Sequence, residues 1–550
     1  MSLKQLVKNA IVNVLNNFHN EGFLSSEFNA ENLKFNITEP NIPEKMNQDQ
    51  VVYNYSTNIA FLLKQYVKAA PFTIAEKVAS ELAKDDLFVR VDVSMPGFIN
   101  IVLSPKAFEF VLLEIAKNKH LYGGSYINKT PINVEFVSAN PTGFLHVGHA
   151  RGAAFGDSLV RVLRHAGYDV EAEYYVNDAG NQINILEASA RVRYLELFGI
   201  QTEMPEDCYR GNDIIWAAQQ IKDQYGDYFV EYNETKREEF KTIATKILLD
   251  KIKSDLNDFN VSFNTFSSEK KLKDDGLIQP VIEKLKPNCY TQDGALFLKT
   301  TEYGDDKDRV LIKSDGSYTY LTPDIAYHKT KFDKCDKLIN IWGADHSGYI
   351  ARMKIAMQCL GYNPDNLDVL TIQLVRLIKD GQEFKMSKRA GTSVTLADLL
   401  DVSNSDVIRF MMLTREINNK FDFDIDFANS HDSNNPVYIV QYAHSRTVSL
   451  LEKLKEPKFD ENVQLTEKAK KVILHLDEFV EIIKTIVNTS KVNLMTQYLI
   501  DLAKVFNSFY AETKLIGNEF EAAYALLVKD VQTVLRLGLS LIGVSAPDSM

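Results

Sequence analysis

Apolar and polar positions follow three successive patterns along the 550-residue chain. In residues 1–112, helical spacing of apolar residues is mixed with the strict alternation that is typical of half-buried strands. This pattern predicts a small α+β module with helices over 3–18 and 59–82 and strands over 33–37, 89–93 and 99–103.

From Pro131 the pattern changes to apolar strands separated by helical stretches. The strands are "INVEFV", "VEAEYYV", "KLINIW" and "LDVLTIQLV", and a charged helical insertion occupies about residues 185–260. Strands that alternate with helices predict an α/β domain over 113–430, with a mainly parallel sheet covered by helices on both faces. Ligands of such sheets bind at the carboxyl ends of the strands.

Residues 431–550 contain amphipathic helical patterns and no convincing strand. The predicted helices cover 436–455, 466–489, 495–515 and 519–541, and Asn435 is a plausible N-cap before Pro436. The third predicted domain is therefore an all-α bundle.

Composition narrows the classes of protein. The 62 basic and 74 acidic residues give a net charge of −12, which argues against indiscriminate nucleic-acid binding but leaves room for a local basic groove. Four scattered cysteines form no CxxC pair, so neither a disulfide frame nor a zinc site is expected. The chain shows no membrane span and no signal-peptide pattern at its start, so we expect a cytoplasmic protein without a membrane partner.

The stretch "VEFVSANPTGFLHVGHARGAAFGD" joins a strand, a tight turn and a helix that begins near Val147. His146 and His149 are three residues apart at this helix start, where free backbone N–H groups favour anions. A purine could lie against Gly148, and the two imidazoles could donate to phosphate oxygens. Capping or core packing of the two histidines is the structural alternative.

A second motif, "GQEFKMSKRAGTSVTL", places Lys385, Lys388 and Arg389 around Met386-Ser387. Three cations on one loop could stabilise the charge of a developing pyrophosphate in the transition state. By itself such a loop is also compatible with solvated surface.

Together HVGH and KMSKR resemble the HIGH and KMSKS motifs of class I aminoacyl-tRNA synthetases. Longer strings resemble arginyl-tRNA synthetases over essentially the whole chain: "EFVSANPTGFLHVGHARGAAFGD", "EYYVNDAGNQI", "DGSYTYLTPDIAYH", "GADHSGY" and "NPVYIVQYAHSR". The chain departs from the family's usual residues at Phe144, Ser347 and Ser445, and "VYNYSTN" replaces a Gly-Asp-containing motif in the N-terminal module.

The resemblance implies a Rossmann-like catalytic domain between an N-terminal tRNA-binding module and a C-terminal anticodon-binding bundle. It implies activation of L-arginine by ATP with Mg2+, transfer to tRNA(Arg), no zinc and a monomer. Activation would require tRNA. The implied catalytic residues are His146, His149, Lys385 and Lys388, and the implied ATP-binding residues are His146, Gly148, His149, Asp345, Lys385, Met386, Ser387 and Lys388.

A guanidinium needs carboxylates and hydroxyls in a fixed fork. The resemblance implies that Glu135, Tyr320 and Asp324 bind the arginine side chain, while Asn140 and His346 hold its α-amino and carboxylate end. Tyr320 and Asp324 are four apart, so on a helical turn they would share a face. Alternatives remain: Tyr320 in a core, Asp324 as an N-cap, Glu135 in a structural ion pair, and His346 at the ATP ribose.

Polar residues also follow the strand "EYYV": Asn177, Asp178, Gly180, Asn181 and Gln182 are expected in a loop that lines the site. For tRNA, "QYAHSR" and "TEKAKK" in the bundle could stack on bases and meet phosphates, although lysine runs are often only solvated helix faces.

Rival functions are a small-substrate nucleotidyltransferase, against which the KMSKR loop and the bundle argue, and a tRNA-binding paralogue without catalysis. The cysteine-specific synthetase would need zinc-binding thiols that this pattern lacks.

Overall fold

The structure is a computed structural model that describes residues 1–40, 51–125, 129–344, 347–384, 394–430, 434–460 and 462–550. Its N-terminal module packs three helices on an antiparallel sheet of order β1-β2-β4-β3. The elements are α1 (Leu3–Asn20), β1 (Ile37–Thr38), β2 (Tyr55–Thr57), α2 (Ile59–Leu63), α3 (Pro71–Leu82), β3 (Phe88–Ser94) and β4 (Phe98–Leu103).

Two predictions for this module were wrong in detail. The expected helix over 59–82 is two helices, because Pro71 lacks the backbone N–H that a continuous helix would need and instead begins α3 as its first residue. The expected strand over 33–37 is shortened to Ile37–Thr38; Leu33 and Phe35 are buried without pairing as a strand.

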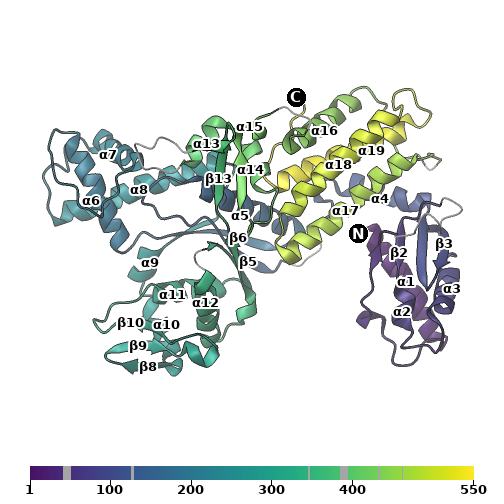
Figure 1. Cartoon of the computed structure of the whole chain (residues 1–550), viewed down its shortest axis with the longest axis horizontal. Helices are drawn as coiled ribbons and strands as arrows, with labels where there is room; N and C mark the ends of the chain where they lie inside the picture. Colours follow the sequence, from purple (N-terminus) through teal and green to yellow (C-terminus); the bar gives the residue numbers. More distant parts are fainter. Residues whose placement is uncertain (41–50, 126–128, 345–346, 385–393, 431–433, 461) are drawn as a thin grey trace.

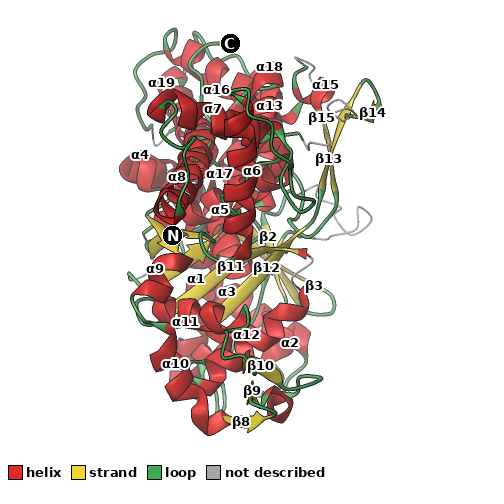
Figure 2. Ribbon diagram, turned by 90° about the vertical axis from the view of Figure 1, so that its left-hand side faces the viewer, coloured by secondary structure: helices red, strands yellow, loops and turns green. Residues whose placement is uncertain are grey.

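The central domain contains a five-stranded parallel sheet of order β12-β11-β5-β6-β7, which confirms the predicted α/β class. Its strands are β5 (Pro131–Glu135), β6 (Asp169–Val176), β7 (Thr265–Ser268), β11 (Lys337–Gly343) and β12 (Leu367–Ile372). Helices cover both faces, as Figure 2 shows for the strands between two helical layers. Phe136 packs against Gly156 of α5 (Val147–Ala166) on one face, and Glu135 contacts Lys331 of α11 (Leu321–Phe332) on the other.

The insertion is helical, as predicted, and extends to one end of the molecule in Figure 1. It consists of α6 (Asn181–Glu196), α7 (Asn212–Tyr225) and α8 (Glu234–Asp258). Two three-stranded sheets were not predicted, because their strands have five or fewer residues and are mostly only half-buried. The first sheet contains β8 (Cys289–Gln292), β9 (Ala295–Leu298) and β10 (Arg309–Ile312). The second contains β13 (Val375–Lys379), β14 (Gln382–Glu383) and β15 (Phe421–Asp424). The remaining helices are α9 (Glu269–Asp274), α10 (Ile278–Leu285), α12 (Ser347–Cys359), α13 (Leu396–Val402), α14 (Ser405–Met412) and α15 (Ile425–Ala428).

Four helices form the C-terminal bundle, and all four were predicted. They are α16 (Pro436–Leu451), α17 (Glu467–Thr489), α18 (Asn493–Glu512) and α19 (Glu521–Leu541). Asn435 caps α16 by accepting a hydrogen bond from the Val437 amide at 3.0 Å. The bundle lies beside α5, and α4 (Pro105–Asn118), which crosses the predicted boundary at residue 112, packs on α17 and α19. No helix within the described ranges is long and apolar enough to cross a membrane.

Candidate functional site

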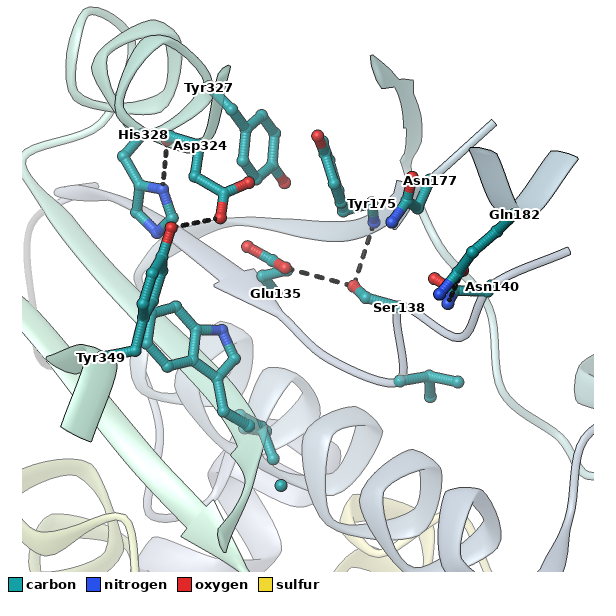
Figure 3. Close-up of a pocket in the computed structure, with 14 residues that line it drawn as sticks. Glu135, Ser138, Asn140, Tyr175, Asn177, Gln182, Asp324, Tyr327, His328 and Tyr349 are labelled. Carbon is teal, nitrogen blue, oxygen red and sulfur yellow. Dashed lines mark hydrogen bonds between the residues drawn. The ribbon is translucent and has the colours of Figure 1, made fainter. Parts of the chain in front are cut away.

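A cavity of about 400 Å³ opens at the carboxyl ends of β5, β6 and β11 (Figure 3). In the sheet, β6 and β7 lie on one side of β5, and β11 and β12 lie on its other side. The cavity is therefore at the point where the strand order reverses. Its lining residues are Glu135, Val137, Ser138, Asn140, Tyr175, Asn177, Gln182, Asp324, Tyr327, His328, Ile341, Trp342, Gly343 and Tyr349.

Asp324 provides a carboxylate that has no cationic partner in the described part of the chain. One of its oxygens accepts a hydrogen bond from the Tyr349 hydroxyl at 2.8 Å. Burial, helped by the negative charge of Glu135, raises the pKa of Asp324 from 3.8 to about 7. A cation placed in this cavity would supply the missing partner and favour the ionised form.

Glu135 also lines the cavity, but its charge is already compensated. Its Oε2 lies 2.6 Å from Nζ of Lys331, and both side chains are buried. Its Oε1 accepts a hydrogen bond from Ser138 at 3.2 Å. Glu135 therefore forms the structural ion pair that the sequence left open, here with Lys331, and it also lines the cavity.

Asn140 lies on the side of the cavity opposite Asp324, in the turn after β5 (Figure 3). Its side-chain amide donates to Oε1 of Gln182 at 2.6 Å. Gln182 and Asn177 line the same cavity. Of the polar loop after β6, Asp178 instead accepts hydrogen bonds from Ser268 and from the Lys270 amide.

Tyr320 stands apart from the other expected arginine-binding residues. It precedes α11 and its side chain is 83% exposed, so the structure does not bring it to the cavity wall beside Asp324. The tyrosine and histidine side chains of the cavity wall were not predicted as site residues: Tyr175, Tyr327, His328 and Tyr349. They lie inside the sequence strings that carry the resemblance, but no local pattern distinguishes them from core aromatic residues.

His146 and His149 cap α5 and face each other. The Gly148 amide donates to Nδ1 of His146 at 3.1 Å, and the His146 amide donates to Nδ1 of His149 at 3.2 Å. Their ring centroids are 3.7 Å apart. Burial lowers the pKa of both rings, that of His149 to about 3. Both are therefore neutral, and since each Nδ1 accepts, each Nε2 carries a proton that it can donate.

The start of α5 is also bonded to the segment after the KMSKR motif. The Val147 amide donates to the Val394 carbonyl at 3.1 Å, and the Leu396 amide donates to the Leu145 carbonyl at 2.7 Å. A Cβ on Gly148 would lie 3.0 Å from the His146 ring, closer than an ordinary van der Waals contact, so a side chain at this position would crowd the folded-back imidazole. Asp345, His346, Lys385, Met386, Ser387, Lys388 and Arg389 lie outside the described residues.

The bundle presents an aromatic and basic patch on α16 and α18. The Arg446 guanidinium lies 4.7 Å from the Tyr442 ring centroid and 4.9 Å from that of Tyr510. By contrast, Lys468 and Lys470 pair with Glu512 and Glu467, as expected of a solvated helix face. Within the described ranges, no group of three or more His, Cys, Asp or Glu side chains could hold a metal ion.

Comparison with known proteins covers all three parts of the chain. Residues 112–426 match the model for "tRNA synthetases class I (R), catalytic domain", residues 440–550 the "DALR anticodon binding domain", and residues 1–103 the "Arginyl tRNA synthetase N terminal domain".

Curated relatives extend this similarity over nearly the full length. The "Arginine--tRNA ligase" of Listeria welshimeri is 44% identical over 532 residues, which are 94% of this chain and 96% of the relative. That of Bacillus subtilis is 43% identical over 546 residues, 96% and 98% of the two chains. The solved structure of the Thermus thermophilus arginyl-tRNA synthetase, 21% identical, has the same fold with a TM-score of 0.76 over 100% of both chains. The chain belongs to the arginyl-tRNA synthetase family of class I aminoacyl-tRNA synthetases.

Proposed function

We propose that the protein is an arginine–tRNA ligase whose arginine pocket is the cavity between β5 and β11. It joins L-arginine to ATP, forming arginyl-adenylate and diphosphate, and then transfers the arginyl group to the 3'-terminal adenosine of tRNA(Arg) with release of AMP. The assignment rests on the Asp324 carboxylate, which faces the cavity, has no cationic partner among the described residues, and has a pKa raised to about 7. The guanidinium of arginine supplies the positive charge that would pair with this carboxylate.

In this proposal Asp324 and Glu135 accept hydrogen bonds from the guanidinium, and Asn140 with His346 holds the α-amino and carboxylate end. Tyr320 contacts the arginine only after its exposed side chain moves toward the cavity, because the ring starts 83% exposed. Such placement holds the α-carboxylate of arginine in line with the α-phosphate of ATP, and positioning of this kind accounts for much of the rate.

ATP is proposed to lie at the start of α5, bound by His146, Gly148, His149 and Asp345, with Lys385, Met386, Ser387 and Lys388 over the phosphates and Mg2+ accompanying the nucleotide. The α-carboxylate attacks the α-phosphorus and diphosphate leaves, so no covalent enzyme nucleophile is needed. Because the two histidines are neutral, they act as Nε2–H donors, and the positive charge on the diphosphate side comes from Lys385 and Lys388.

The division into residues 1–112, 113–430 and 431–550 assigns tRNA contacts to the first and third parts and chemistry to the second. Tyr442 and Arg446 support the third assignment, since an exposed ring with an adjacent guanidinium can stack on an unpaired base. We further propose that the enzyme is a cytoplasmic monomer.

The test is ATP–pyrophosphate exchange with each of the twenty amino acids, with and without tRNA(Arg). Exchange with arginine alone supports the pocket, and exchange only when tRNA is present supports tRNA-dependent activation. Exchange with another amino acid would remove the assignment of Asp324 and Glu135. Absence of exchange under every condition would favour a tRNA-binding protein without catalysis, whereas adenylyl transfer to a small substrate without tRNA charging would favour the nucleotidyltransferase.

A further inference from the structure

Behind the proposed arginine pocket, a buried chain of polar side chains connects the Glu135 carboxylate to the backbone carbonyl of Asp324. Nζ of Lys331 donates to Oε2 of Glu135 at 2.6 Å and to Oδ1 of Asn340 at 2.9 Å. Nδ2 of Asn340 lies 2.7 Å from Nε2 of His328, and Nδ1 of His328 lies 2.8 Å from the Asp324 carbonyl oxygen. Lys331, Asn340 and His328 are at most 3% exposed.

Lys331 determines the direction of every bond in this network. An ammonium group can only donate, so the Asn340 oxygen must face Lys331 and its NH2 group must face His328. His328 Nε2 therefore accepts, and Nδ1 carries the proton that it donates to the Asp324 backbone. Burial, together with the charge of Lys331, lowers the pKa of His328 to about 3, which keeps the ring in this neutral form.

The charges of the pocket depend on the same lysine. Glu135 and Asp324 are the acidic residues that line the cavity, and no lysine or arginine does so among the described residues. A third carboxylate near Asp324, that of Glu269, is paired with Lys273 at 2.5 Å. Arginine brings one side-chain positive charge, whereas two unpaired buried carboxylates would bring two negative charges.

We infer that Lys331 is a positioning residue that sets arginine specificity: it neutralises Glu135, so that Asp324 is left as the acidic group of the described pocket lining whose charge is not compensated until the ligand binds. Glu135 then remains available as a hydrogen-bond acceptor without competing with Asp324 for the ligand's charge. This inference rests on the proposed function, because it assumes that the cavity receives the arginine side chain.

The groups that face Asp324 determine how substitutions act on it. These are Glu135 on β5, Lys331 and His328 on α11, Tyr349 on α12, Glu269 on α9 and Tyr175 on β6. The negative charge of Glu135 raises the pKa of Asp324 and the positive charge of Lys331 lowers it. Removal of either charge alone should therefore shift the pH dependence of arginine use in opposite directions.

The experiment compares wild type, Lys331→Met, Glu135→Gln and the double variant that carries both substitutions and so keeps the charge balanced. Lys334→Met, at an exposed lysine of the same segment, is the matched control. Aminoacylation of tRNA is measured between pH 6 and 9 for kcat and for the KM values of arginine and ATP, with the neutral analogue citrulline as competing substrate. Each single variant should raise the arginine KM roughly tenfold to a hundredfold and the ATP KM much less. The pH midpoint should move up by about one unit in Lys331→Met and down in Glu135→Gln.

The double variant distinguishes charge balance from packing. Its arginine KM and pH midpoint should lie closer to wild type than those of either single variant, and Glu135→Gln should lose most of the discrimination against citrulline. Effects that simply multiply in the double variant, or midpoints that do not separate, would overturn the role of Lys331. Should Lys331→Met fail to fold, the double variant should still lie closer to wild type in arginine KM and pH midpoint than Glu135→Gln does, and a double variant that lies no closer would overturn the role of Lys331. A wild-type enzyme that does not charge arginine would instead refute the proposed function.

Discussion

The backbone amide of Leu396 donates a hydrogen bond to the carbonyl of Leu145 at 2.7 Å, which joins the residue before His146 to the start of α13. A second bond, from the Val147 amide to the Val394 carbonyl, completes the pairing. The start of α5 is thus attached by two backbone hydrogen bonds to the segment that begins at Val394, directly after residues 385–393, which lie outside the described part of the chain.

Arg151 strengthens this junction, and Arg151→Lys should weaken it. Its buried guanidinium donates to the carbonyls of Gln373, Glu416 and Asn419, which flank the KMSKR segment on both sides in sequence. A lysine keeps the charge but cannot reach all three carbonyls. We expect a stability loss of about 1–2 kcal/mol and a raised ATP KM, measured by thermal unfolding and pyrophosphate exchange. The same change at the exposed Arg376 should leave the ATP KM unchanged.

His149→Ala should lower kcat by about 10²–10³, the usual cost of one preorganised donor. His149→Gln, which can still donate, should recover part of this loss. Because burial lowers the pKa of His149 from 6.5 to about 3, the unfolded chain binds the additional proton between these pH values. The stability from this group is therefore complete above pH 6.5 and declines as the pH falls toward 3. An NMR titration that found either imidazole protonating near pH 6.5 would contradict the neutral-donor role.

Asp324→Asn should separate activity from stability. The substitution removes the charge that we propose to pair with the arginine side chain, so the arginine KM should rise at least about a hundredfold. The raised pKa of about 7 means that the folded protein binds the additional proton between pH 4 and 7, so this group costs increasing stability as pH rises through that range. At pH 8 the variant should be more stable than wild type by on the order of 2–4 kcal/mol, measured by urea unfolding. A variant that is less stable than wild type at pH 8 would show that the Asp324 carboxylate has a positively charged partner.

Gly156→Ala should prevent α5 from packing on the sheet. A Cβ at this position would lie 2.2 Å from Cγ of the buried Phe136, and neither the helix nor the strand can move without disturbing the site. We expect a loss of at least about 3 kcal/mol. Gly152→Ala on the same helix is the matched control, since its Cβ would make an ordinary 3.6 Å contact with Ile372. Equal unfolding midpoints for the two variants would refute the steric argument.

Arg446→Met should weaken tRNA binding and reduce its dependence on salt. The guanidinium, which contacts the Tyr442 and Tyr510 rings, is the positive charge of this patch. Loss of one phosphate contact should lower the slope of log affinity against log salt by about one, measured by filter binding of tRNA(Arg). The arginine KM should not change. Lys471→Met removes an exposed charge elsewhere on the bundle and serves as control; an equal effect there would mean that only net charge matters.

Much of the architecture followed from local pattern. The sequence predicted the four bundle helices, the Asn435 cap, the strands β5, β6 and β11, and the helix start at Val147. These features depend on amphipathic spacing, capping residues and turn chemistry, which act between residues close in sequence. The failures were also local: Pro71 divided one expected helix, and short strands such as β8 and β14 have too few residues to show an alternation.

The electrostatic character of the site was decided by tertiary structure alone. The sequence indicated Glu135 and Asp324 as carboxylates for the arginine side chain and left a structural ion pair open for Glu135, but only the fold identifies Lys331 as the partner of the first and Tyr349 as that of the second. Glu135 and Lys331 are 196 positions apart, and no local pattern encodes such a pairing. The physical reason is that burial and charge pairing set the protonation state of a carboxylate, and both depend on which distant segments the sheet brings together.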